Sequence, residues 1–288
     1  MRSRTTRLWS ALALGAVLVL TGCTSDGDAE PAADADPTTA PATSAAPAPA
    51  PPPAVPVPGS CFRISYDEAV APTNEDTALP CTEGHTSQTF AVGSLDLEVN
   101  GHLLAIDSDF VQTQVAKRCP RRLAPYLGAN PKQLRLTMLR PVWFTPTLAE
   151  SDAGAGWYRC DVIAVTGDSK LAKLDSDLSR ALKDPDVRAA YGMCGTAQPG
   201  TEEFSHVLCR EDHSWRAISV VDLGRSSKDG VYPGVKAVRR AGEDGTCADA
   251  AREVAVDALD YQWGYEWPTA DQWTAGQTYG RCWAPDAS

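Results

Sequence analysis

Eight cysteines beyond residue 60 constrain the fold of this chain more than any other feature. They divide in order into two quartets, and the second and third cysteines of each quartet are 38 residues apart. A repeated spacing of this kind predicts a repeated disulfide framework. The quartets are Cys61, Cys81, Cys119 and Cys160, then Cys194, Cys209, Cys247 and Cys282.

The residues around the cysteines repeat as well. Cys81-Thr-Glu-Gly-His85 matches Cys209-Arg-Glu-Asp-His213. Residues 146–160 align without a gap on residues 268–282, and both segments hold a Pro-Thr pair, an Ala-Gly pair and a closing Arg-Cys pair. This self-similarity predicts a tandem repeat of roughly 100 residues. The two copies occupy residues 59–167 and 192–288.

Each copy has the pattern of a strand, a helix, a loop and a strand, which predicts an α+β fold. The expected strands cover residues 86–92, 156–165, 214–221 and 277–283. Each expected helix carries the third cysteine of its quartet. The apolar faces of these helices are Val111, Val115 and Cys119 after a cap at Asp107 or Ser108, and Cys247, Ala251, Val254 and Ala258 after a cap at Thr246.

The symmetry of the two quartets favours local disulfides. The simplest set is Cys61–Cys81, Cys119–Cys160, Cys194–Cys209 and Cys247–Cys282. Eight cysteines allow 105 pairings, so other connectivities stay open at this point. Each bridge is expected to contribute on the order of 2–4 kcal/mol.

Residues 168–191 join the two copies and are expected to form a connecting helix. Leu171, Leu174, Leu178 and Leu182 fit a helical stripe. The pair Asp184-Pro185 is expected to end this helix. We expect the helix to pack on one of the repeats, and a role in binding a partner is the alternative.

The N-terminus has the features of an exported lipoprotein. Three arginines precede an apolar stretch at residues 8–19, which is too short to span a bilayer but typical of a signal peptide. The stretch ends in Leu20-Thr21-Gly22-Cys23, which resembles a bacterial lipobox. Residues 1–22 are therefore interpreted as a signal peptide and Cys23 as the lipidated first residue, carrying acyl chains such as palmitate. An ordinary signal peptide is the alternative.

Residues 23–58 are expected to form a disordered tether after the lipid. Residues 24–58 consist almost entirely of Ala, Pro, Thr, Ser and Asp, and ten of the 22 prolines of the chain lie there. Such a segment buries too little apolar surface to fold, and its prolines favour an extended conformation. The sequence thus predicts an extracytoplasmic protein that is lipid-anchored to the cell membrane, with its folded part held away from the bilayer.

The charge of the chain excludes one class of partner. The full chain has a net charge of −11, and removal of the three signal-peptide arginines gives −14. Nucleic-acid binding depends on Lys and Arg that neutralise phosphates, so no nucleic-acid partner is expected. The expected partners are the membrane, through the lipid, and a cell-wall polymer or other division and envelope proteins.

His85 and His213 are candidate ligand-binding residues because they occupy matching places, four residues after a cysteine. A metal site with Cys81 and Cys209 would need reduced thiolates, which exported proteins rarely keep. No metal and no cofactor are therefore expected. The structural alternative is that each imidazole hydrogen-bonds the turn before its strand.

Aromatic residues near the C-terminus form a second candidate ligand-binding group. The candidates are Tyr261, Trp263, Tyr265, Trp267 and Trp273. The first four alternate with other residues, so in a strand they would share one face. An exposed aromatic face could stack on sugars or anchor a partner; the alternative is that these residues form a hydrophobic core against the disulfides.

The sequence holds no recognisable catalytic motif, neither a Gly-x-Ser-x-Gly elbow nor His-Glu-x-x-His. We therefore expect a non-enzymatic binding or scaffolding module. The alternative is an enzyme that acts on cell-wall material through carboxylates dispersed in the sequence.

Together these motifs resemble the septum formation family. The resemblance covers about residues 58–283 and rests on Gly59-Ser60-Cys61-Phe62, the Cys81-x-x-x-His85 element, Cys119 in a helix and the closing Pro-Thr…Arg-Cys160. It implies an actinobacterial lipoprotein of the cell envelope with a link to division septa. The resemblance carries over no catalytic residues.

Overall fold

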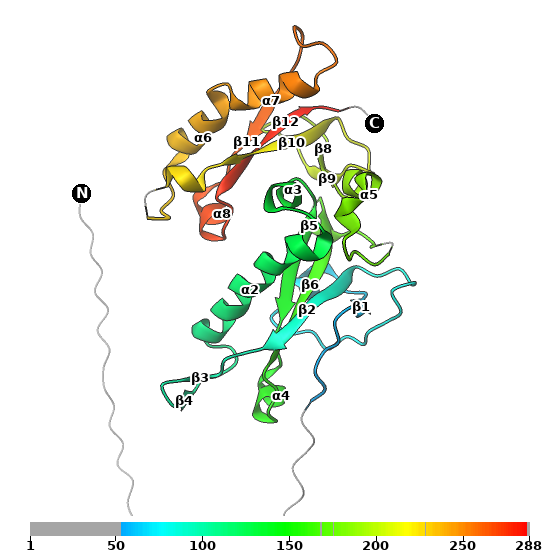
Figure 1. Ribbon diagram of the computed structural model, residues 1–288, viewed down its shortest axis with the longest axis vertical. Coiled ribbons are helices and arrows are strands. Elements are labelled where there is room, and N and C mark those ends of the chain that lie inside the picture. The colour runs from blue at the N-terminus through cyan, green and yellow to red at the C-terminus, as the bar shows by residue number, and fades with distance from the viewer. Residues whose placement is uncertain (1–52, 168, 175, 228, 287–288) are drawn as a thin grey trace, which may run out of the picture. The chain divides into compact units, whose positions relative to one another are not determined.

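Two antiparallel sheets with the same strand order organise the folded chain (Figure 1). The computed structural model describes residues 53–286 except 168, 175 and 228. The predictions for the signal peptide, for Cys23 and for most of the tether therefore lie outside the described residues. The mixture of helices and sheets confirms the predicted α+β class.

The strands of the two sheets correspond in order. The first sheet runs β1 (Cys61–Phe62), β2 (Ser87–Ser94), β6 (Trp157–Thr166) and β5 (Leu139–Phe144), with β7 (Lys170–Leu171) paired to β6. The second runs β9 (His206–Leu208), β8 (Met193–Gly195), β10 (Trp215–Asp222), β12 (Tyr279–Pro285) and β11 (Gly264–Glu266). Thus β8, β10, β12 and β11 occupy the places of β1, β2, β6 and β5.

The register of the long central strands also corresponds. The pairing of β2 with β6 shifts between Thr89 and Ala91, and Ala91 lies opposite Cys160. The pairing of β10 with β12 shifts at the same place, and Ser219 lies opposite Cys282. Both central strands therefore carry an irregularity beside the last cysteine of their quartet.

Helices cover one face of each sheet (Figure 1). Helix α2 (Asp109–Leu127) packs on the first sheet, and helices α6 (Val235–Glu243) and α7 (Thr246–Val254) pack on the second. The cysteine-bearing helices α2 and α7 lie where they were predicted. Two details were wrong: Gly245 rather than Thr246 is the N-cap of α7, and Val254 is exposed at its end, so Ala258 does not join the buried face.

The repeated Pro-Thr pair has a local physical explanation. Thr147 caps α4 (Leu148–Asp152) through a capping box with Glu150, and Thr269 caps α8 (Ala270–Thr274) through one with Gln272. Each box satisfies backbone donors that would otherwise be free at a helix start. The remaining short elements are α1 (Tyr66–Ala69), α3 (Pro131–Arg135), α5 (Pro185–Ala190), β3 (Glu98–Val99), β4 (His102–Leu103) and the 3-10 turns Ala181–Lys183 and Gly224–Ser226.

Four disulfides join cysteines that are neighbours in the order of the sequence, as predicted: Cys61–Cys81, Cys119–Cys160, Cys194–Cys209 and Cys247–Cys282. In each half, one of the bridges fastens a helix, α2 or α7, to an interior strand of the sheet, β6 or β12. The helices therefore cannot leave their sheets while these bridges are oxidised.

The predicted connecting helix over residues 168–191 is wrong. The segment begins with β7, which pairs with β6, and with a backbone bridge between Leu174 and His85. It ends in the 3-10 turn Ala181–Lys183 and the short helix α5. Leu174, Leu178 and Leu182 are buried although they do not share a helical face. The pair Asp184-Pro185 begins a helix instead of ending one, because the Asp184 side chain accepts from two backbone N–H groups of α5 and proline fits the first helical turn.

One hydrophobic core spans both sheets. It includes Val115 and Leu123 from α2, Val162 from β6, and Trp215 and Trp283 from the second sheet. The two halves therefore share their packing and are not separate domains. Among the helices described, none has the length and apolar character that crossing a bilayer requires.

Candidate functional site

His85 and His213 stabilise matching turns. The Nδ1 atom of His85 lies 2.9 Å from the carbonyl oxygen of Glu83, and that of His213 lies 2.7 Å from the carbonyl oxygen of Glu211. His85 is fully buried. The geometry therefore supports a structural role for both histidines, in which each imidazole hydrogen-bonds the turn before its strand.

The cysteines beside these histidines offer no thiolate to a metal. Cys194, Cys209 and His213 bring potential ligand atoms within 4.8 Å of one another, but both sulfurs belong to a disulfide. His85 lies just before β2 of the first sheet, and His213 lies just before β10 of the second.

The candidate aromatic residues pack mainly in the second half of the core. Tyr265 and Trp273 are buried, while Trp263 and Trp267 are partly buried and pack against the same cluster. The β11 strand covers only Gly264–Glu266, so the four alternating aromatics do not form one exposed strand face. The core interpretation is therefore correct for Trp263, Tyr265, Trp267 and Trp273. Tyr261 is half-buried.

Tyr265 shows why two glycines flank this cluster. Its hydroxyl donates to the carbonyl oxygen of Val238 at 3.0 Å. A Cβ atom at Gly242 or Gly280 would lie about 2.5 Å or less from its side chain. The ring therefore fills a slot that only glycine leaves open.

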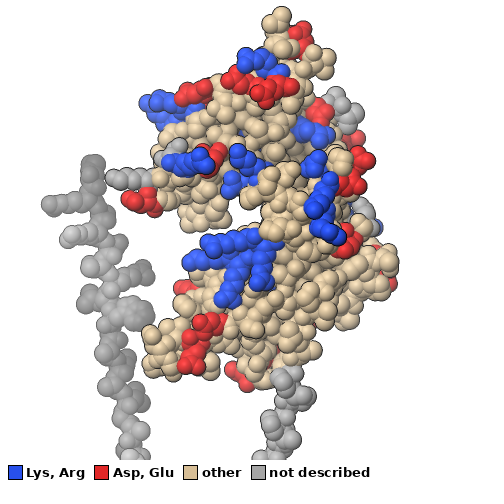
Figure 2. Space-filling view, viewed as in Figure 1, with Lys and Arg blue, Asp and Glu red and all other residues tan. Residues whose placement is uncertain are grey.

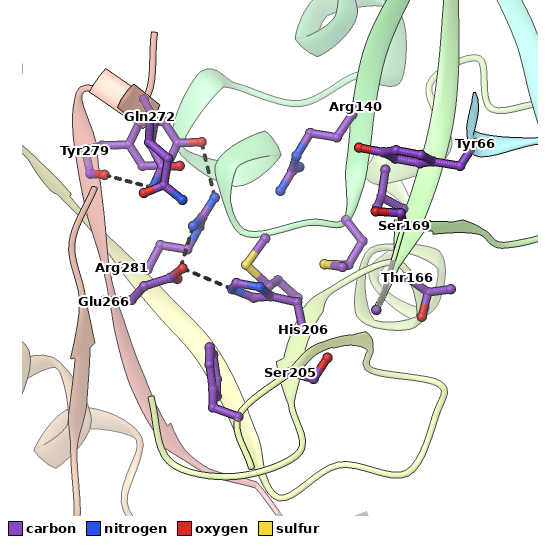
Figure 3. A pocket seen from close by; sticks show the side chains of 16 residues that line it. Tyr66, Arg140, Thr166, Ser169, Ser205, His206, Glu266, Gln272, Tyr279 and Arg281 are labelled. Carbon is purple, nitrogen blue, oxygen red and sulfur yellow. Dashed lines mark hydrogen bonds and ion pairs between the residues drawn. The ribbon is translucent and has the colours of Figure 1, made fainter. Parts of the chain in front are cut away.

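A polar pocket of about 480 Å³ lies where the two sheets meet, and we call it the junction pocket (Figure 3). The first sheet and its neighbouring segments contribute Tyr66, Met138, Arg140, Val165 and Thr166. The second half contributes Phe204, His206, Glu266, Gln272, Tyr279 and Arg281, among others. The volume lies within the range of small-molecule sites.

A partly buried ionic network forms the wall of the pocket on the second sheet (Figure 3). Nη1 of Arg281 lies 3.1 Å from Oε2 of Glu266, and Nε2 of His206 lies 3.1 Å from Oε1 of the same carboxylate. Arg281 also donates to the carbonyl oxygen of Arg135 and to the hydroxyl of Tyr279. The strand pairing of Glu266 with Arg281 brings acid and base together.

Arg140 reaches the pocket from β5 and has no carboxylate partner among the described residues. Its Nη1 donates to the carbonyl oxygens of Thr137 and Leu139 at 2.7 and 2.8 Å. Burial and the neighbouring Arg281 lower the pKa of Arg140 to about 10, so it stays charged at neutral pH. With Arg281 balanced by Glu266, the pocket keeps one uncompensated positive charge when His206 is neutral. Such a charge favours an anionic ligand.

A family model described as Septum formation matches residues 143–282, from β5 to the last cysteine. The chain carries a septum formation family domain. No curated protein and no solved structure matched the chain significantly.

The septum formation domain holds only part of the junction pocket. His206, Glu266, Tyr279 and Arg281 lie inside the matched segment, whereas Arg140 lies three residues before it. The resemblance in the sequence extended over a longer range, from about residue 58. The complete pocket thus needs strands from both the matched segment and the preceding part of the chain.

The equivalent arginine in the first sheet is enclosed instead of facing a pocket. Arg159 precedes Cys160 as Arg281 precedes Cys282, and it pairs with Asp161 at 3.1 Å. The rings of Phe62 and Phe144 lie 4.0 and 4.6 Å from its guanidinium carbon. By register, Phe144 occupies the place that Glu266 holds in the second sheet. The second sheet therefore has an acid where the first sheet has an aromatic cover.

Sequence reasoning missed the main residues of this site. It noted Arg281 only as part of a repeated Arg-Cys pair, and it noted neither Arg140 nor Glu266. A signal was present: Arg140 lies in a stretch from Phe110 to Ala149 that contains seven Lys and Arg residues and no acid.

The pH dependence of stability is expected to report on Glu266. Burial disfavours its charge, but His206 and Arg281 outweigh burial and lower its pKa from 4.5 to about 2. The folded-state pKa lies below the unfolded value, so the contribution is complete above about pH 4.5 and is lost as the pH falls towards 2. In the unsubstituted protein, the free energy of unfolding should fall by on the order of 2–3 kcal/mol over this pH range because of Glu266. The Glu266→Gln variant should not show this fall.

Urea unfolding at a series of pH values measures this effect. The Glu253→Gln variant, which removes an exposed carboxylate of α7, is the control for charge alone. Parallel curves for Glu266→Gln and the unsubstituted protein over this range would contradict the assignment.

Proposed function

We propose that this chain is an extracytoplasmic, lipid-anchored and non-catalytic binding module that holds a carboxylate-bearing wall fragment in the junction pocket. The septum formation domain supports a septum-related role. The observation that carries the ligand class is Arg140, a cation inside a pocket whose other arginine is already neutralised. A carboxylate would supply the missing counter-charge and accept hydrogen bonds from the N–H groups of the guanidinium.

The lining of the pocket favours a polar ligand of modest size. Hydroxyl and amide groups from Tyr66, Thr166, Gln272 and Tyr279 surround the arginines. These groups can hydrogen-bond the hydroxyls of a sugar, while Phe204 and Met138 offer apolar contacts. A monosaccharide with one carboxylate matches both the charge and the lining.

The single acid of the pocket supports a binding role over glycoside hydrolysis. Glu266 is the one carboxylate among the described residues that line this pocket. Hydrolysis of a glycosidic bond ordinarily uses two carboxyl groups, one of them with a raised pKa. The pKa of Glu266 is lowered to about 2, so it is unsuited to donate a proton at neutral pH.

Export and anchoring complete the proposal. The lipobox ending at Cys23 supports attachment by lipid, and the proline-rich residues up to 58 support a spacer. Four disulfides support an oxidising compartment. The chain would thus present its pocket to the cell wall.

We also propose that the two halves are a tandem repeat with diverged sites. The matching strand order, the matching register shift and the matching capping boxes support this origin. In this view the first copy kept its arginine as a structural ion pair, and the second acquired Glu266 and a pocket.

Ligand binding tests the proposal with two sugars that differ in one group. N-acetylmuramic acid carries a lactyl carboxylate that N-acetylglucosamine lacks. We expect the full chain in uncharged detergent to bind only the first, and Arg140→Gln to weaken binding by at least about tenfold. The variant should change the free energy of unfolding by less than about 1 kcal/mol, because lost hydrogen bonds are offset by relief of a buried charge.

The matched control is Arg225→Gln, which removes an exposed arginine outside the pocket. Equal binding of both sugars, or unchanged binding by Arg140→Gln, would overturn the pocket assignment. In cells, a fluorescent fusion should concentrate at septa, and the Arg140→Gln fusion should spread over the envelope. A uniform distribution of the unsubstituted fusion would contradict the proposed septal site of action.

A further inference from the structure

One helix of this acidic protein carries an unbalanced positive face. The stretch from Phe110 to Ala149 holds seven of the 26 Lys and Arg residues and none of the 37 acids. The remainder of the chain therefore has a net charge of −18, from 19 bases and 37 acids. Four of the seven cations lie within six residues of α2, and we call them the α2 basic face: Lys117, Arg118, Arg121 and Arg122.

The helix presents these cations to solvent because its opposite face is buried in the core. Val115, Cys119 and Leu123 are fully buried, whereas Lys117, Arg121 and Arg122 are exposed. Figure 2 shows Lys and Arg side chains gathered over α2 beside a hollow in the surface. The acids Asp107 and Asp109 lie at the opposite, N-terminal end of the helix.

The cations have no acidic partners within the described part of the chain. Arg118 donates to the carbonyl oxygen of Ser94 and lies over the ring of Tyr158, but no ion pair is formed by any member of the face. The residues are spaced i, i+4 as Lys117 with Arg121 and Arg118 with Arg122. Like charges at this spacing destabilise a helix by a few tenths of a kcal/mol per pair. The arrangement therefore works against helix stability.

We propose that the α2 basic face docks an anionic cell-wall polymer, a chain of sugar or polyol units with repeating phosphate or carboxylate groups. The two rows of cations extend over roughly 8 Å along the helix, at 1.5 Å per residue. A thin polymer can contact this strip alone. An anionic bilayer would also face the acidic remainder of the chain, so the excess of −18 disfavours it.

The inference rests on the proposed envelope location but is independent of the junction pocket. A ligand in the pocket is small and meets one uncompensated cation, whereas the helix offers several exposed charges to an extended chain. The two sites can therefore be disabled separately, and each proposal can fail without the other.

Cosedimentation with purified wall sacculi tests the inference on the full chain in uncharged detergent. We expect stronger binding to sacculi that retain their anionic polymers than to sacculi from which acid has extracted those polymers, because extraction leaves only the peptidoglycan that the junction pocket is proposed to hold. The Lys117→Gln, Arg121→Gln, Arg122→Gln triple variant should bind on the order of tenfold more weakly and show a smaller dependence on salt. Arg118 is kept because it also contacts the protein.

The matched control removes the same charge from cations that have acidic partners: Arg225→Gln, Arg239→Gln and Arg252→Gln. This control should cosediment like the unsubstituted chain, and the α2 triple variant should still bind N-acetylmuramic acid. Equal binding to intact and extracted sacculi, or equal losses in the two triple variants, would overturn the inference. Preferential binding to vesicles of phosphatidylglycerol would also overturn it, in favour of a membrane partner.

Discussion

Replacement of Asp161 by asparagine is expected to destabilise the protein by about 3–5 kcal/mol. Asp161 is fully buried and lies 3.1 Å from Arg159, which is almost fully buried as well. The hydroxyls of Ser87 and Thr89 donate to its two oxygens at 2.8 Å. The substitution removes the negative charge and leaves a buried guanidinium without a counter-ion.

The double substitution Arg159→Met, Asp161→Leu is expected to cost much less than Asp161→Asn alone. Burial lowers the pKa of Arg159 and raises that of Asp161, so the interior opposes both charges. Apolar replacement of a buried ion pair removes this desolvation cost together with the attraction. Chemical denaturation under oxidising conditions measures both variants.

A surface ion pair provides the matched comparison for this experiment. Arg239 and Glu243 lie one helical turn apart on α6, with half-exposed side chains. The Glu243→Gln variant should change the free energy of unfolding by less than about 0.5 kcal/mol. If Asp161→Asn cost no more than this control, the buried pair would not have the structural role inferred for it.

Removal of the Cys119–Cys160 disulfide is expected to cost about 4 kcal/mol. The bridge closes a separation of 41 residues, and the loop-entropy relation gives about 3.9 kcal/mol for that length. The Cys194–Cys209 bridge closes only 15 residues and is expected to contribute about 3 kcal/mol. Both cysteines of each pair are replaced by alanine so that no free thiol remains.

The comparison of the two disulfide variants carries the test. Cys119 and Cys160 are also fully buried in the shared core, so the loss of packing adds to the entropic effect. Urea denaturation should therefore rank the longer loop as the costlier loss. A greater loss on removal of Cys194–Cys209 would show that strain or residual structure, rather than loop length, sets the contributions.

The sequence contained the local framework of the fold but not its non-local arrangement. Equal cysteine spacings and repeated flanks were enough to predict the central strands and the cysteine helices. They favoured the observed disulfide pairs but left other connectivities open. The connecting segment was misread because Leu174, Leu178 and Leu182 have helical spacing, yet they are buried from a backbone bridge, a loop and a 3-10 turn. Tertiary burial overrides local periodicity in such a segment.

The candidate site could not be predicted from the sequence for a related reason. Arg140 and Arg281 are far apart in the sequence and meet only because the two sheets pack together. Glu266 gains its role from its register opposite Arg281 on β12. The aromatics near Glu266 were more conspicuous, but the density that drew attention to them reflects a core around Tyr265.

The connectivity of the disulfides has a consequence for biogenesis. Among the described residues, each bridge joins a cysteine to the next one along the chain, and no bridge encloses or crosses another. A polypeptide that is translocated from its N-terminus can therefore close each bridge as its second cysteine emerges, before the following pair arrives. Oxidation in simple order of appearance would then give these four bridges without any rearrangement.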